Sequence, residues 1–313
     1  MGKRVVKFSS VILVLAMLAV TPAMAQQGKK IKVGVAMALI NPFVTYLIQG
    51  MQNYEKTHPE FDVTVVDAKS DANTQLGQVE SFIAEGYDAI VVLVVDAKMS
   101  GPIVADCKQA KIPLIALNRK FDNPDCFIGT DAIAGGVKLG QEMVRRTNGQ
   151  GNAAIIHGVM GQESEVMRTK GIMQVLAQNP GIKVVLEGAA DWDRAKGLNL
   201  VENWIQSGTK FNIIFAESDE MAIGAFKAVS AVNMRKNYII GSCDGGQAGV
   251  QAVSTGDIDF TCFQDPYQQG ALSLQAAAKL SAGQSVDKQI LVEWQLVTKE
   301  NADKYVKMYA GNQ

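Results

Sequence analysis

Short apolar runs alternate with longer amphipathic stretches along most of the chain. Most of the short runs are unbroken series of Val, Ile and Leu, not alternating apolar and polar positions. Unbroken runs are typical of strands buried on both faces, and therefore of parallel sheets covered by helices. The predicted strands are Ile31–Met37, Val63–Asp67, Ala89–Val94, Pro113–Leu117, Cys126–Gly129, Ala153–His157, Val184–Glu187, Ile213–Ala216, Tyr238–Ser242 and Phe260–Phe263.

The stretches between these runs have helical spacing and helix-end signals. Pro42 follows Asn41 as a proline in a first helical turn, and Gly86 follows Glu85 as a stop. About ten strand–helix units are too many for one small sheet, so two doubly wound α/β domains are expected, with the first crossover after the strand at Cys126. Predicted helices include Pro42–Lys56, Thr74–Glu85, Gly135–Thr147, Val166–Gln178, Arg194–Ser207 and Tyr267–Ala282.

Polar and aromatic residues gather directly after the predicted strands, where open parallel sheets bind their ligands. Any single Asn, Asp or Ser there is also explained as the cap of the next helix, which suits Ser218 and Asp219. Capping explains neither Trp192 nor the pair Asn118-Arg119. The strand-end residues are Asn41, Pro42, Phe43, Asp96, Asn118, Arg119, Asp191, Trp192, Ser218, Asp219, Asp244, Gln264 and Asp265.

This set of side chains suits a ligand that carries many hydroxyl groups. Carboxylates and amide oxygens accept hydrogen bonds from hydroxyls, arginine and amide nitrogens donate to them, and an aromatic face packs on the C–H side of a sugar ring. Hydrogen bonds to charged groups contribute about 1.5–3 kcal/mol each. A handful of them, less the cost of ordering the partners, predicts affinity on the order of micromolar or tighter.

Composition and motifs argue against several other functions. The 313 residues hold 30 Lys+Arg and 31 Asp+Glu, so no basic face for nucleic acid is expected. The sequence contains no nucleophile elbow, P-loop or dinucleotide fingerprint, so neither an enzyme nor a cofactor is expected. A carboxylate pair such as Asp244 and Asp96 leaves a sugar hydrolase open. His58 and His157 are far apart in sequence, and no metal site is expected.

The first 25 residues have the pattern of a secretory signal peptide. Basic Lys3, Arg4 and Lys7 precede an apolar run from Val11 to Val20 and the cleavage motif Ala23-Met24-Ala25. Removing these three charges changes the formal net charge from -1 to about -4, which describes a mildly acidic exported protein. In an oxidising compartment the four cysteines form the disulfides Cys107–Cys126 and Cys243–Cys262, or remain four buried thiols.

An ordered series of short motifs resembles the periplasmic ribose-binding-like proteins, the sugar-binding components of ABC importers. The densest match joins Phe215-Ala216 to the run from Asp219 to Ala225. The similarity covers the whole chain after the leader. The other matching pieces are Ile31–Met37 with Asn41-Pro42-Phe43, Ile112-Pro113-Leu114 with Asn118-Arg119, Gly129-Thr130-Asp131 with Gly135-Gly136, Gly161 with Arg168 and Gly171, Ala190–Arg194, Asp244-Gly245 and Gln264-Asp265-Pro266.

The resemblance implies which residues contact the ligand. It adds Arg168, which a reading of the helix alone would leave as a solvated arginine. The sequence departs from the family pattern at Val44, Asn118, Trp192 and Ser218, where a second aromatic, an Asp, a Phe and an Asn are usual. We therefore expect a six-membered ring in preference to plain ribose. The implied contacts are Asn41, Phe43, Asn118, Arg119, Arg168, Trp192, Ser218, Asp244 and Gln264.

The resemblance also implies a type I periplasmic binding protein, with two lobes joined by a three-segment hinge near 130–131, 264–265 and 293. The lobes are expected at 26–130 plus 265–293 and at 131–264 plus 294–313. Their closure traps a pentose, a hexose or inositol, which a monomeric binding protein delivers to a permease and ATPase at the inner membrane. A receptor for a sugar-like signal or chemotaxis ligand and a secreted sugar-modifying enzyme are the alternatives. A sugar-responsive repressor core would need a DNA-binding motif where the leader stands.

Overall fold

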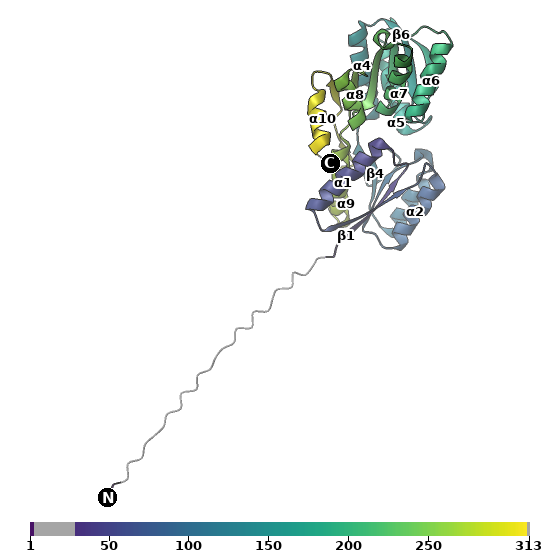
Figure 1. Cartoon of the computed structure of the whole chain (residues 1–313). Coiled ribbons are helices and arrows are strands. Elements are labelled where there is room, and N and C mark those ends of the chain that lie inside the picture. The colour runs from purple at the N-terminus through teal and green to yellow at the C-terminus, as the bar shows by residue number, and fades with distance from the viewer. Residues whose placement is uncertain (3–28, 312–313) are drawn as a thin grey trace.

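The computed structural model describes residues 1–2 and 29–311, so the predicted signal peptide lies almost wholly outside the described residues. Two lobes lie one above the other (Figure 1), and each is built on a six-stranded sheet. The first sheet has the order β11-β5-β4-β3-β1-β2 and the second β12-β10-β9-β8-β6-β7. In both lobes the strand order reverses beside the first strand, as in doubly wound folds.

Each sheet is covered by helices on both faces, as unbroken apolar runs predict. In the first lobe, one core lies under α1 and α9 and a second under α2 and α3. In the second lobe, α4 and α5 cover one face, and α6, α7, α8 and α10 cover the other. The first-lobe elements are β1 (Ile31–Met37), α1 (Pro42–Thr57), β2 (Phe61–Asp67), α2 (Ala72–Ala84), β3 (Ala89–Leu93), α3 (Gly101–Ala110), β4 (Leu114–Leu117), β5 (Cys126–Gly129), α9 (Pro266–Ser281) and β11 (Gln289–Leu291).

The second lobe begins directly after β5. Its elements are α4 (Ala132–Thr147), β6 (Gly151–His157), α5 (Glu163–Leu176), β7 (Ile182–Ala189), α6 (Arg194–Gln206), β8 (Ile213–Ala216), α7 (Asp219–Ala231), β9 (Ile239–Asp244), α8 (Gln247–Thr255), β10 (Phe260–Phe263), β12 (Gln295–Thr298) and α10 (Ala302–Gly311). No helix in the part of the chain that the structure describes is both long and apolar enough to cross a bilayer.

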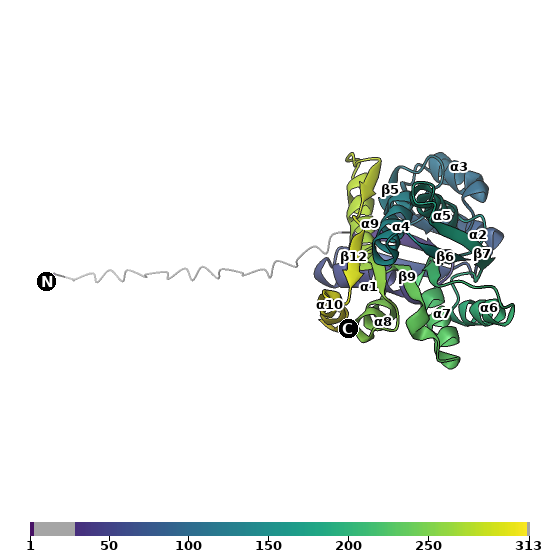
Figure 2. The same cartoon turned by 90° about the horizontal axis from the view of Figure 1, so that it is seen from above.

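The chain passes between the sheets three times, in residues 130–131, 264–265 and 292–294. Two helices of different lobes, α1 and α8, lie beside this junction in both views (Figures 1 and 2), and the Tyr46 hydroxyl donates to Gln247 Oε1 across it at 3.1 Å. The Trp294 indole donates to the carbonyl of Asp131 at 2.8 Å and ties two of the crossings together. The lobe boundaries given in the sequence analysis, within which each lobe is expected to move as one rigid unit, stay a prediction.

The last pass adds two strands that the sequence analysis did not predict. β11 pairs in parallel with β5, and β12 pairs antiparallel with β10, so the second sheet is not purely parallel. β11 has only exposed and half-buried positions. Hydrogen bonding to a sheet edge, and not apolar burial, makes it a strand, and hydropathy carries little signal of such pairing.

The cysteines are four free, buried thiols, the second of the two alternatives left open by the sequence. Cys107 and Cys126 lie in cores on opposite faces of the first sheet, so no bond between them fits this fold. Cys243 and Cys262 are register neighbours on β9 and β10. Burial raises the pKa of the Cys107 thiol to about 12 and that of Cys126 to about 11, so both stay protonated.

Glycines set the close packing of three helix pairs, and one pair bears on the site. A Cβ on Gly136 of α4 would collide with the carbonyl oxygen of Arg168 on α5, and one on Gly171 would collide with the carbonyl of Ile133. The α4–α5 contact thereby fixes how far Arg168 stands from the neighbouring helix. The same arrangement joins α6 to α7 and α1 to α9, through Gly197, Gly224, Gly50 and Gly270.

Replacing Gly136 by alanine is expected to destabilise the protein by about 1–3 kcal/mol, because the added methyl overpacks a backbone contact. A thermal melt followed by circular dichroism measures the loss. Gly77→Ala on α2 is the matched control, since a Cβ there meets no atom within 4 Å. That variant should melt at the wild-type temperature or slightly above it. Equal melting of both variants would contradict the proposed role of the contact.

Candidate ligand-binding site

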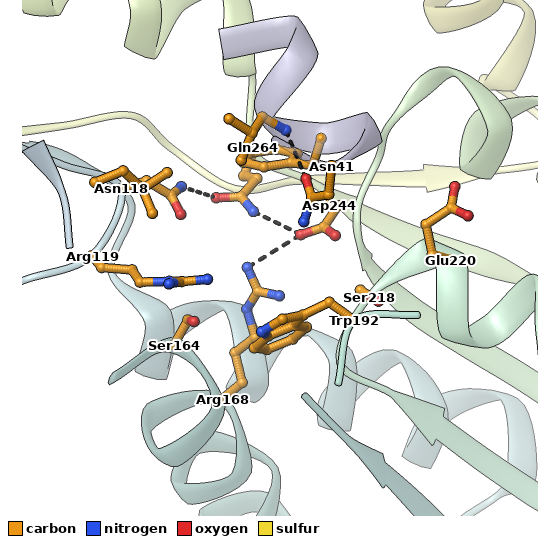
Figure 3. A pocket seen from close by; sticks show the side chains of 13 residues that line it. Asn41, Asn118, Arg119, Ser164, Arg168, Trp192, Ser218, Glu220, Asp244 and Gln264 are labelled. Atoms are coloured by element: carbon orange, nitrogen blue, oxygen red, sulfur yellow. Dashed lines mark hydrogen bonds and ion pairs between the residues drawn. The ribbon is translucent and has the colours of Figure 1, made fainter. Parts of the chain in front are cut away.

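One pocket lies between the two lobes at the carboxyl ends of their strands. All nine residues predicted as ligand contacts line it, together with four others (Figure 3). That they bind a ligand stays a prediction. The lining residues are Asn41, Phe43, Val44, Leu93, Asn118, Arg119, Ser164, Arg168, Trp192, Ser218, Glu220, Asp244 and Gln264.

Several strand-end residues do not line the pocket and have local roles instead. Asp96 and Asp265 cap the helical turns that follow them. Asp191 pairs with Lys196 at 2.7 Å on the surface. Asp219 is buried beneath the site, where it accepts hydrogen bonds from Ser242 Oγ, Thr261 Oγ1 and the Gly246 amide. With Asp96 outside the pocket, the carboxylate pair considered for a hydrolase is not assembled.

A chain of polar side chains crosses the pocket from one lobe to the other (Figure 3). Asn118 Nδ2, at the end of β4, donates to Gln264 Oε1 at 3.1 Å. Gln264 Nε2 then donates to Asp244 Oδ1 at 2.8 Å. Arg168 Nη2 lies 3.2 Å from the same carboxylate oxygen. The Asp244 carboxylate accepts, so it selects the nitrogen of Gln264, and the Gln264 oxygen in turn selects Asn118 Nδ2 as its donor.

The ion pair at the end of this chain is buried, with Arg168 only 4% exposed and Asp244 9% exposed. Burial raises the pKa of Asp244, and the adjacent Arg168 guanidinium opposes the shift. Burial alone would lower the pKa of Arg168, but Asp244 and the other nearby acidic groups, Glu217 and Glu163 among them, together outweigh burial and the pKa is raised. Arg168 Nε has no hydrogen-bond partner among the described protein atoms. A buried donor without a partner is costly and favours a ligand that supplies an acceptor.

Asp244 projects into the pocket because of an unusual backbone turn at the end of β9. Its φ is +108°, and Gly245 follows at +66°. Such values cost a non-glycine residue free energy and persist only where surrounding contacts hold them. One contact is the Tyr309 hydroxyl on α10, which donates to the Gly245 carbonyl at 2.8 Å.

Arg119 faces Arg168 across the pocket from the first lobe (Figure 3). Its Nη1 donates to the carbonyl of Val94 at 3.1 Å. Burial, and secondarily the charge of Arg168, lowers the pKa of Arg119 to about 10, so it remains a cation at neutral pH. Glu220 also lines the pocket, but its carboxylate pairs with Arg194 at 2.8 Å. Both pocket carboxylates are therefore paired with an arginine, which favours an uncharged ligand over a cation.

A buried network behind Arg168 holds that residue in place. Arg168 Nη1 donates to the main-chain carbonyl of Glu217. The Glu217 carboxylate accepts from Thr169 Oγ1 at 2.6 Å and from the Gly158 amide at 2.9 Å, and it lies 3.7 Å from His157. Burial alone would lower the pKa of His157, but the carboxylates of Glu217, Glu187 and Glu165 raise it. The sequence analysis did not predict this cluster, because its members lie far apart along the chain.

Trp192 forms one wall of the pocket and is presented by strained backbone. Asp191 and Trp192 both have positive φ, at +52° and +61°. The indole lies on Gly158, where any Cβ would collide with the ring. The guanidinium of Arg168 stands 5.7 Å from the ring centroid, within range of a cation–π interaction. The wall is thereby fixed from behind and from the side.

Four pocket residues were not among the predicted ligand contacts. Ser164 lies four residues before Arg168 on α5, one helical turn away, and that spacing was a usable signal. Glu220 lies in the first turn of α7, two residues after the cap Ser218. Val44 was noted only as a departure from the family pattern, and Leu93 is an apolar strand residue that nothing in a single sequence separates from the core.

Comparison with known proteins decides the family. Residues 33–285 match the model of a periplasmic binding protein domain. The chain belongs to this family. The match confirms the predicted class and the type I fold. A putative rhizopine-binding protein of Rhizobium meliloti is 35% identical over 283 residues, which is 87% of this chain and 92% of that protein.

Two further family members bear on the site. The ribose import binding protein of Haemophilus influenzae is 30% identical over 83% of this chain and 88% of its own length. A solved ABC transporter solute binding protein from Bacillus halodurans with bound myo-inositol is 36% identical, with a TM-score of 0.87, over 91% of this chain and 100% of that chain. The relatives are binding proteins, and this periplasmic binding protein is likewise not an enzyme.

Proposed function

We propose that this periplasmic binding protein captures a cyclic polyol, with myo-inositol as the preferred ligand, and delivers it to an ABC permease. The observation that carries the proposal is the pocket itself. Arg119 and Arg168 approach from opposite lobes, Asp244 lies between the lobes, and Trp192 closes one side. Hydroxyls of a ring held there can exchange hydrogen bonds with these charged and amide groups.

Departures from the family pattern bear on the size of the ligand ring. They include the pocket wall formed by Trp192 and the replacement of a carboxylate by Asn118. Trp192 offers a broader stacking face than the Phe usual in ribose-binding-like proteins, and Ser218 leaves more space than a longer Asn. Asn118 replaces an acceptor-only carboxylate, and its amide is already engaged by Gln264 and Gln269. These changes support a six-membered ring. The bound myo-inositol of the Bacillus halodurans structure, whose protein is 36% identical, supports the same choice.

Binding between the lobes implies a mechanism of capture. A ligand that contacts both lobes binds the closed form better and shifts an equilibrium between open and closed forms. Release then requires that the closed form be opened again, which in this proposal occurs on the transporter. Export of the protein, with its leader removed, is part of the same proposal.

Isothermal titration calorimetry against a panel of ligands tests the proposal. The protein from residue 26 onward is unfolded, dialysed and refolded to remove any co-purified ligand, then titrated with myo-inositol, D-glucose, D-ribose and xylitol. We expect a Kd on the order of micromolar or tighter for myo-inositol. We expect at least about 100-fold weaker binding of ribose. Tight ribose binding without any cyclohexitol or hexose binding would refute the assignment.

A further inference from the structure

Gln162 is a side chain that neither the sequence analysis nor the pocket lining identified, and it stands between the two lobes. It occupies the N-cap position of α5 in the second lobe, six residues before Arg168, and its side chain makes no capping hydrogen bond. Its Oε1 accepts a hydrogen bond from the Trp192 indole nitrogen at 2.8 Å. Its Nε2 donates to the carbonyl of Val95 at 3.4 Å, in the segment that follows β3 of the first lobe.

The donor and acceptor pattern fixes the orientation of this amide. The indole N–H can only donate, so it selects the oxygen of Gln162. The amide nitrogen is then left facing the Val95 carbonyl, which can only accept. Both ends of one side chain are thus matched to groups on opposite lobes.

The surroundings hold both partners of Gln162 in place. On one side, Trp192 rests on Gly158, and its backbone φ of +61° directs the ring toward the pocket. On the other side, the neighbouring Val94 carbonyl accepts from Arg119, a pocket residue of the first lobe. The segment that Gln162 reaches is therefore already connected to the site. Gly161, at a φ of +85°, supplies the turn that leads into Gln162.

From this geometry we propose that Gln162 is a closure latch that bridges the lobes and holds the Trp192 wall over the bound ligand. One amide reaches both the indole and the Val95 carbonyl in the arrangement of the lobes seen here, and moving the lobes apart would break the contact with Val95. The latch therefore lengthens the lifetime of the closed complex and does not contribute to the first encounter. Gln162 acts as a positioning residue. This inference rests on the proposed function and assigns the retention step of the same site.

Two substitutions distinguish the hydrogen bond of Gln162 to the Trp192 indole from its hydrogen bond to the Val95 carbonyl. Gln162→Ala removes both hydrogen bonds. Gln162→Glu keeps an oxygen acceptor for the indole but places a second oxygen against the Val95 carbonyl, so the contact between the lobes becomes repulsive. Gln174→Ala is the matched control, because Gln174 is an exposed glutamine on the same helix.

The experiment measures release of radiolabelled myo-inositol after a chase with excess unlabelled ligand, together with the association rate. A net hydrogen bond corresponds to a factor of about 2 to 10 in an equilibrium or rate ratio. We therefore expect Gln162→Ala to release ligand about 10-fold faster than wild type, with an unchanged association rate and melting temperature. We expect Gln162→Glu to release it at least as fast. Gln174→Ala should match wild type.

The emission of Trp192 in the ligand complex provides a second readout. It should change in Gln162→Ala, which loses the partner of the indole, and stay near wild type in Gln162→Glu. Release at the wild-type rate from both variants would overturn the latch, as would slower association with unchanged release. If wild-type protein binds none of the panel ligands, the proposed function fails first, which is a different result from a bound ligand released at one rate.

Discussion

Replacing Arg168 by alanine is expected to weaken myo-inositol binding by at least about 100-fold. The guanidinium faces the pocket, its Nη2 lies 3.2 Å from Asp244, and its Nε has no protein partner among the described residues. Two lost hydrogen bonds to a charged group, at about 1.5–3 kcal/mol each, give this factor or a larger one. Titration calorimetry with myo-inositol measures the change.

Two further variants separate binding from folding in this experiment. Removing Arg168 leaves Asp244 as an unpaired buried carboxylate, so some loss of melting temperature is expected. Arg168→Lys keeps a cation beside Asp244 but lacks the planar fork of donors, and it should fold and still bind weakly. Arg145→Ala, on α4 and outside the pocket lining, should leave the affinity unchanged, although it removes one partner of the buried Glu142 carboxylate. An unchanged Kd in folded Arg168→Ala would show that this arginine serves only the fold.

Replacing Trp192 by alanine is expected to weaken myo-inositol binding by about 10- to 100-fold, because a ring of this size buries a large apolar face against the ligand. The affinity of Trp192→Phe for myo-inositol should lie between that of Trp192→Ala and that of wild type. Titration calorimetry again gives the affinity. The change in melting temperature should be small, since the indole is only half-buried and packs on a glycine.

Tryptophan fluorescence gives an independent test that the ligand contacts Trp192. The chain has three tryptophans, Trp192, Trp204 and Trp294. Trp204 lies in the core of the second lobe, away from the pocket. We expect the emission change on ligand addition to be lost in Trp192→Phe and kept in Trp204→Phe. Retention of the full change in Trp192→Phe, with its loss in Trp294→Phe, would show that Trp192 does not report the ligand, since the Trp294 ring also lies 5.4 Å from the Arg168 guanidinium.

The strands show where a single sequence is informative. Burial on both faces demands an unbroken apolar run, so β1, β5, β8 and β10 were predicted with the same bounds as in the structure. The edge strand β7 alternates between exposed and half-buried positions after its first residue, and its predicted range was too short. β11 and β12 were missed because pairing with a distant strand, and not local hydropathy, makes them strands.

The site divides in a similar way. Asn41, Asn118, Trp192, Ser218 and Gln264 all follow strands, so the rule for open sheets points to them. Arg168 lies inside a helix, and only family resemblance indicated it. No local rule finds Glu217 behind Arg168 or Gln162 above Trp192, because their partners come from elements far away in sequence.

The sequence by itself determined that the protein has two doubly wound lobes and which polar residues stand at the ends of their strands, because hydrophobic period and strand-end position are local properties. The tertiary structure decided which of those residues face one another, that both pocket carboxylates are paired with arginines, and that one amide reaches across the lobes. These are distances between elements separated by many residues. They depend on how close two helices can approach, as at Gly136 and Gly171, and that packing is settled only when the whole chain has folded.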